Sequence, residues 1–224
     1  MTHCQRSSRS ELSYTGHVPS IYALKPRFQG LLRPLARTLA HTGVTANQVT
    51  TFSCVLSIVI GLLLTFRPEA HALLLVLPGF LFMRMALNAI DGMLAREFGQ
   101  KSNLGAYLNE LTDVISDAFL YLPFAYLPGF DPLWMGAVIV LSVVTEMTGT
   151  VAVMTGASRR YDGPMGKSDR AFVFGALGLW LGLGGGVAPW ASYWFPKLLA
   201  LLLLVTIVNR VRNGLAETNY ANAK

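Results

Sequence analysis

The chain has 224 residues, of which 53% are hydrophobic and 13% charged, with a net charge of +6. A soluble domain usually carries about 25% charged residues, so the shortage of charge points to lipid as the solvent and excludes disordered, collagenous and disulfide-rich chains. The apolar residues fall in long runs, which favours one bundle of membrane-spanning helices.

The first part of the chain precedes every apolar run. Residues 1–21 form a polar tail with Arg6 and Arg9 and no apolar stretch behind them, so we expect no cleavable signal peptide. In residues 22–42, Lys and Arg alternate with Leu and Phe. This pattern predicts an amphipathic helix in the membrane interface, with an ordinary soluble surface helix as the alternative.

Residues 43–214 contain six apolar runs of about the length that a bilayer requires. Thr45 and Gln48 have the spacing of a capping box, which would start the first run. The sequence therefore predicts an all-α membrane protein with six transmembrane helices after the interfacial helix, at residues 46–66, 71–96, 103–127, 131–156, 170–187 and 195–213.

Six crossings place both termini on one side of the membrane. Fifteen of the 18 Lys and Arg residues then fall on that side, which the positive-inside rule makes cytoplasmic. Residues 215–224 become a cytoplasmic tail, and the basic charge requires no nucleic acid. Cys4 and Cys54 suit a reduced, cytosol-facing protein, because they form neither a disulfide framework nor a metal site.

Ionisable residues inside the predicted spans are costly in lipid, so they must face a polar interior or one another. If the second and third spans form an antiparallel hairpin, Asp91 faces Asn109, Asn88 faces Asp113, and Arg84 faces Asp117. Helical spacing also places the polar residues of each span on one stripe. The members of this set are Arg84, Asn88, Asp91, Asn109, Asp113 and Asp117.

Two of these facing pairs, Asp91 with Asn109 and Asn88 with Asp113, offer oxygen ligands alone. Such ligands suit a hard cation such as Mg²⁺ together with phosphate. Small residues beside them, Gly92, Ala95 and Gly105, would let a backbone or a base come close. The deeper Arg84 and Asp117 are better explained as a structural ion pair than as catalytic groups. Glu110 is either a spare ligand or bonded to a neighbouring helix, and Glu146 has no predictable partner.

From Asn88 the sequence reads N-A-I-D-G-M-L-A-R-E-F-G-Q-K-S-N-L-G-A-Y-L-N-E-L-T-D. It resembles the CDP-alcohol phosphotransferase signature D-x2-D-G-x2-A-R-x8-G-x3-D-x3-D at every spacing, and looks closest to bacterial inner-membrane members. The resemblance implies CDP-diacylglycerol and an alcohol acceptor as substrates, CMP as product, a divalent metal pair, a cytoplasmic site among membrane lipids and a homodimer.

Two signature carboxylates are replaced, because Asn88 and Asn109 stand where the family has aspartate. The resemblance makes Asp91, Asp113, Asn88 and Asn109 the metal ligands, and Asp113 the base that deprotonates the acceptor. Since affinity for hard cations falls with the charge of the ligands, we predict one Mg²⁺ or Mn²⁺ ion and not two.

Two further segments resemble family features. Asn47 and Thr50 occupy part of a P-N-x-x-T pattern without its proline and would shape the nucleotide pocket together with Gly92, Ala95, Arg96 and Gly105, although they could simply cap and pack the helix. The cytoplasmic loop supplies cations that would bind an acceptor or lipid phosphate, with an ordinary positive-inside loop as the alternative. These cations are Arg159, Arg160, Lys167 and Arg170.

We therefore expect a metal-dependent inner-membrane transferase that moves a phosphatidyl group from CDP-diacylglycerol to the hydroxyl of a polar acceptor, phosphorylated or neutral. Two other functions stay open. Asn88 and Asn109 suit a non-catalytic relative that still binds nucleotide or lipid, and the intramembrane charges suit a small proton-coupled transporter. Release of CMP would distinguish the transferase from both.

Overall fold

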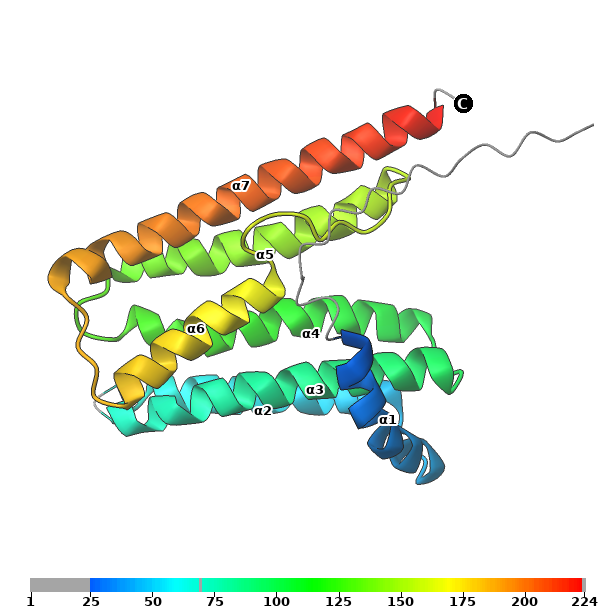
Figure 1. Cartoon of the computed structure of the whole chain (residues 1–224), viewed down its shortest axis with the longest axis horizontal. Helices are drawn as coiled ribbons and strands as arrows, with labels where there is room; N and C mark the ends of the chain where they lie inside the picture. The colour runs from blue at the N-terminus through cyan, green and yellow to red at the C-terminus, as the bar shows by residue number, and fades with distance from the viewer. Residues whose placement is uncertain (1–24, 69, 223–224) are drawn as a thin grey trace, which may run out of the picture.

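The computed structural model describes residues 25–68 and 70–222, which leaves the predicted polar tail outside it. Every regular element in this part of the chain is helical (Figure 1). The elements are α1 (Lys25–His41), α2 (Ala46–Thr65), η2 (His71–Leu75), α3 (Val76–Glu97), α4 (Asn103–Tyr121), η3 (Leu122–Ala125), α5 (Pro132–Met154), α6 (Lys167–Gly182) and α7 (Pro189–Asn222).

Each predicted helical segment in the described residues contains a helix, and four are long and apolar enough to cross a membrane: α2, η2 with α3, α5 and α7. The other two differ for physical reasons. α4 carries Glu110, Asp113 and Asp117 within 19 residues. α6 has only 16 residues and is therefore about 24 Å long. α7 continues as helix through the segment expected to be a tail, as far as Asn222.

The helices form a bundle whose centre is occupied by α4 and α6. Figure 1 shows α5 beside α7 on one side and α2 beside α3 on the other. α2 packs closely on both α3 and α4, whereas close contacts between α3 and α4 themselves are few. The predicted antiparallel pairing of α3 with α4 is confirmed at two depths, where Asn88 contacts Asp113 and Arg84 contacts Asp117. The polar side chains of α3 and α4 meet across the space between two helices that α2 holds together.

The apolar core lies between the central helices and the outer ones, away from the polar stripe. The Tyr121 ring of α4 stacks on the Phe174 ring of α6 with centroids 4.0 Å apart, and Phe124 contacts the same ring. All three side chains are buried. This aromatic contact fixes α6 against α4 below the polar residues.

α1 lies across α3 at one end of the bundle (Figure 1). Ala36 is fully buried in a small cluster with Ile90, Met93 and Leu94, while Leu31 and Leu35 stay exposed. Arg33 forms an ion pair with Glu97 at 2.9 Å. One face of α1 is thus attached to the bundle, and its exposed leucines are available to lipid.

The connection from α5 to α6 folds back along the bundle instead of staying at its end (Figure 1). The backbone N–H of Arg160 donates to the Gly149 carbonyl of α5 at 3.2 Å, and the N–H of Met165 donates to Thr206 Oγ1 of α7 at 3.0 Å. Gly149 permits this approach, since an added Cβ would lie 2.5 Å from the Arg160 carbonyl oxygen. These two hydrogen bonds give the irregular backbone of the loop protein partners along the bundle.

The glycines Gly178 and Gly182 of α6 pack inside the subunit. A Cβ at Gly178 would lie 3.1 Å from Leu77, and one at Gly182 would lie 2.9 Å from the Leu75 nitrogen. Their spacing therefore serves the contact of α6 with η2 and α3, and it gives no support to a contact between subunits.

Gly61 sets how closely α2 approaches α4, and we predict that Gly61→Ala destabilises the protein. An added Cβ would overlap the backbone carbonyl of Phe119, and overpacking of this kind costs about 1–3 kcal/mol. Thermal unfolding in detergent should show a lower Tm. The matched control is Gly79→Ala in α3, where an added Cβ meets nothing within 4 Å; equal Tm values for the two variants would contradict the prediction.

Candidate functional site

The first turn of α2 brings the predicted nucleotide residues to the polar stripe. The expected capping box is confirmed: Thr45 Oγ1 accepts from the Gln48 N–H at 3.3 Å, and the Gln48 side chain accepts from the Thr45 N–H at 2.9 Å. One turn later, Thr50 Oγ1 donates to Asp91 Oδ2 of α3 at 2.7 Å, and both side chains are buried. This hydrogen bond orients one carboxylate of the signature.

Asn47 contributes to the same end of the site. A Cβ at Gly105 would lie 2.8 Å from Asn47 Oδ1, so Gly105 is what allows α4 to come this close to α2. The turn between α3 and α4 is attached there too, because Gln100 Oε1 accepts from the Ala46 N–H at 2.6 Å and its Nε2 donates to the Val44 carbonyl at 3.3 Å. The role of Gln100 was not predicted, since no local spacing links it to α2.

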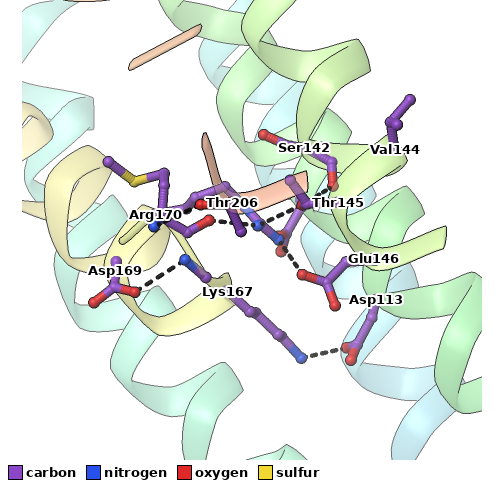
Figure 2. A network of polar contacts seen from close by, with 12 residues as sticks. Asp113, Ser142, Val144, Thr145, Glu146, Lys167, Asp169, Arg170 and Thr206 are labelled. Carbon is purple, nitrogen blue, oxygen red and sulfur yellow. Dashed lines mark hydrogen bonds and ion pairs between the residues drawn. The ribbon is translucent and has the colours of Figure 1, made fainter. Parts of the chain in front are cut away.

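Asp113 lies at the centre of the site, and three donors approach its Oδ1 atom. Asn88 Nδ2 and Arg84 Nη2 are each 3.3 Å away, and the Lys167 ammonium is 2.5 Å away. Figure 2 shows Lys167 extending from the start of α6 to this carboxylate. The prediction that Asn88 faces Asp113 is confirmed. The contact with Lys167 was missed, because it depends on the return of the loop into the bundle.

A chain of buried ion pairs continues from Asp113 into the bundle. Arg84 Nη1 donates to Asp117 Oδ1 at 2.7 Å, which confirms the predicted pair. Arg170 Nη2 donates to the other oxygen of Asp117 at 2.8 Å and to Glu146 Oε1 at 3.1 Å. Arg84, Asp117, Glu146 and Arg170 are all buried. Arginine and carboxylate therefore alternate along a path that links α3, α4, α6 and α5.

Glu146, whose partner could not be predicted, is bound by cations from three segments. Besides Arg170, the Arg210 guanidinium of α7 lies 3.6 Å from Oε1, and Arg159 of the loop lies 3.4 Å from Oε2. Arg210 also donates to the Thr145 carbonyl. Charge balance in the sequence indicates that Glu146 needs cations from neighbouring helices, but it does not say which cations these are.

The four cations of the loop are placed very differently from one another. Arg159 pairs with Glu110 at 2.6 Å, and Thr150 Oγ1 donates to the same carboxylate at 3.1 Å, so Glu110 is bonded to neighbouring segments. Arg160 pairs with Asp162 and with Glu217 of α7, each at 2.7 Å. Partial burial would raise the pKa of Asp162, but its hydrogen bonds from Arg160 outweigh burial and hold the pKa below its usual value.

Arg170 is 1% exposed and turned into the interior (Figure 2). It could reach an acceptor phosphate only by giving up its contacts with Asp117 and Glu146. Lys167 is 29% exposed and is the loop cation whose ammonium lies at the predicted base. The structure therefore brings Lys167, and not Arg170, to the predicted metal and base residues.

The remaining predicted residues line the same end of α3 and α4. The Arg96 side chain is exposed and curls back over Gly92, where an added Cβ would lie 2.7 Å from its Nη2 atom. Ala95 is half-buried, and Asn109 is exposed one turn before Asp113. A small residue at position 92 thus leaves room for a cationic side chain above the site.

The donor set suits one hard divalent cation better than two. Asp91 and Asp113 supply carboxylate oxygens, and Asn88 and Asn109 can supply amide oxygens, which are the ligands that Mg²⁺ and Mn²⁺ prefer. Within residues 25–68 and 70–222, no three His, Cys, Asp or Glu side chains are grouped closely enough to hold a metal by themselves. An ion bound here would complete its shell with the asparagine oxygens and with water or phosphate oxygens.

We predict that Asp117→Leu destabilises the protein more than Arg84→Leu does. Loss of Asp117 leaves two buried guanidiniums without their shared carboxylate, whereas loss of Arg84 leaves Asp117 paired with Arg170. Breaking a buried pair costs about 3–5 kcal/mol. Thermal unfolding of both variants, with Arg33→Ala at the exposed Arg33–Glu97 pair as control, measures the order; a smaller loss for Asp117→Leu would contradict it.

Known proteins resemble this chain in sequence and in fold. It is 44% identical to the inner membrane protein YnbA of Escherichia coli over 88% of this chain and 96% of that protein. It is 25% identical to a phosphatidylinositol phosphate synthase of Mycobacteroides abscessus over 82% of this chain and 83% of that protein. An archaetidylinositol phosphate synthase of Pyrococcus horikoshii is 34% identical over 42% of this chain and 48% of its own length.

Among solved structures, phosphatidylinositol phosphate synthase (PgsA1) of Mycobacterium tuberculosis shares the fold. Its structure with CDP-DAG bound gives a TM-score of 0.66 at 23% identity, covering 81% of this chain and 92% of that one. Its structure in complex with manganese and citrate also gives 0.66, at 24% identity over 81% and 87%. The family model for CDP-alcohol phosphatidyltransferase matches residues 43–209. The predicted resemblance is thus confirmed, and the chain belongs to the CDP-alcohol phosphatidyltransferase family.

Proposed function

We propose that the protein transfers a phosphatidyl group from CDP-diacylglycerol to the hydroxyl of a polar acceptor and releases CMP. The observation that carries the proposal is the placement of Asp91 and Asp113, which keep their signature positions on α3 and α4. Thr50 orients the first by a hydrogen bond and Asn88 contacts the second. The PgsA1 relative with CDP-DAG bound supports the choice of donor.

In this reaction the acceptor oxygen attacks the phosphorus that carries diacylglycerol, and the bond from that phosphorus to the CMP oxygen breaks. Asp113 takes the acceptor proton. Its Oδ2 atom is suited to this, since Arg84, Asn88 and Lys167 all approach Oδ1. Arg84 also donates to the Asp113 backbone carbonyl at 3.1 Å, which holds this turn of α4 in place.

One Mg²⁺ or Mn²⁺ ion, held by Asp91 and Asp113 with Asn88 and Asn109, would polarise the pyrophosphate and stabilise the leaving CMP. The manganese in the PgsA1 relative supports a divalent cation. Arg96 supplies a further positive charge above Gly92 for the nucleotide phosphates. Asn47 and Thr50 would border the nucleotide from α2.

For localisation we propose a bacterial inner membrane protein in which α2, α3, α4, α5, α6 and α7 all cross, with α1 at the cytoplasmic interface. This places both termini and the site on the cytoplasmic side. The identity to an inner membrane protein and the apolar helices support this arrangement. A homodimer rests on the family resemblance.

The second candidate is a member of the family that binds nucleotide or lipid without turnover. The contact between Asn88 and Asp113 favours it, because the Asn88 amide donates to Asp113 and does not offer its oxygen there. Release of labelled CMP from CDP-diacylglycerol, measured across a panel of polar alcohols, distinguishes the two candidates. If CDP-diacylglycerol binds but no acceptor leads to release of CMP, the proposal of a transferase is overturned.

If Asp113 is the base, Asp113→Asn should lower kcat by about 10²–10⁴-fold, the usual contribution of a general base. The matched control is Asp131→Asn, which makes the same chemical change at the N-cap of α5 and preserves capping. Activity assays on both purified variants, with size-exclusion profiles to check folding, provide the test. An active Asp113→Asn enzyme would remove Asp113 from this role.

Asp91→Asn should abolish the dependence of CDP-diacylglycerol binding on Mg²⁺ or Mn²⁺, because one of the two charged ligands is lost. Conversely, Asn88→Asp combined with Asn109→Asp should tighten metal binding by adding two carboxylates to the same set. Calorimetric titration of nucleotide with and without metal measures both effects. Unchanged metal dependence in Asp91→Asn would contradict the ligand assignment.

A further inference from the structure

Lys167 takes a position in the site that its place in the sequence does not indicate. It is the first residue of α6, and the loop before it returns into the bundle through contacts with α5 and α7. As a result, its ammonium lies 2.5 Å from Asp113 Oδ1 (Figure 2). A cation expected at the cytoplasmic surface is thus paired with the carboxylate proposed as metal ligand and base.

The Oδ1 atom has no room for an additional cation while Lys167 is present. Arg84 and Asn88 also direct N–H groups at it, each at 3.3 Å. A divalent cation binds a carboxylate through an oxygen lone pair and repels a nearby ammonium strongly at low dielectric. Because Oδ2 is the atom proposed to take the acceptor proton, Oδ1 is the atom left for a metal ion, and the ammonium competes with the metal for it.

Of the two cations on Asp113, Lys167 is the one that can leave. Arg84 is 4% exposed on its side chain and is held by Asp117 at 2.7 Å. Lys167 is 29% exposed, stands at a helix end, and carries its charge on a flexible four-carbon stem. Its departure breaks one ion pair and leaves the Arg84–Asp117–Arg170 chain intact.

We propose that Lys167 is the internal counter-ion of Asp113, which occupies the metal-binding oxygen and must release it before a divalent cation can bind. The inference rests on the proposed function, since it concerns the same metal site. It assigns Lys167 a positioning role that sets metal affinity. The replacement of two signature aspartates by asparagine increases the effect of Lys167 on metal affinity. One ammonium neutralises half of the charge of a site that has only two carboxylates.

The test is the affinity for Mn²⁺ alone, measured by electron paramagnetic resonance on the full-length protein in detergent. Lys167→Met keeps much of the apolar stem and removes the charge, so it should tighten Mn²⁺ binding about tenfold or more. Lys167→Arg retains the ion pair and should stay near the wild-type affinity. Lys101→Met, which removes an exposed cation from the connection between α3 and α4, controls for loss of one charge.

The outcomes separate the inference from the proposed function. Tighter binding in Lys167→Met than in Lys101→Met, abolished again by adding Asp91→Asn, supports it. Mn²⁺ binding that depends on Asp91 but is equal or weaker in Lys167→Met overturns the role of Lys167 and leaves the metal site standing. If neither the wild type nor Lys167→Met binds Mn²⁺, both the role of Lys167 and the proposed metal site are overturned.

Discussion

The organisation of the bundle depends on one buried carboxylate that is shared by two arginines. Asp117 of α4 binds Arg84 of α3 through one oxygen and Arg170 of α6 through the other. Each of these charges alone would be costly away from water, and the pairing removes most of that cost only while all three helices stay together. The polar chain thus fixes the relative depth of α3, α4 and α6 together with the aromatic contact between Tyr121 and Phe174.

This constraint also accounts for the shape of α6. Arg170 must reach Asp117 and Glu146 in the interior, so the helix that carries it has to begin deep in the bundle. The loop can follow it there because Gly149 and Thr206 provide close approach and a hydrogen bond acceptor. The short α6 and the returning loop are therefore two consequences of the same buried ion pairs, and together they place Lys167 beside Asp113.

The sequence predicted the parts of the site that depend on spacing within one or two helices. Asn88 with Asp113 and Arg84 with Asp117 are confirmed, since the antiparallel register of two consecutive helices sets them. The Thr45–Gln48 capping box is confirmed, since local spacing sets it. It could not predict which cations reach Glu146, because Arg170 and Arg210 come from other helices and no local pattern connects them. For the same reason the packing of α2 on both α3 and α4 was not predicted, although Gly61 and Gly105 mark its close contacts with α4.

Asparagine at positions 88 and 109 changes the charge balance of the site. With two carboxylates left, the ammonium of Lys167 and the guanidinium of Arg84 already balance much of the negative charge near Asp113. A phosphate-bearing substrate brings its own negative charge, so it favours displacement of Lys167 and the entry of a divalent cation together. Metal and substrate should then bind with positive coupling, because each supplies the charge that the other lacks in a site of low dielectric.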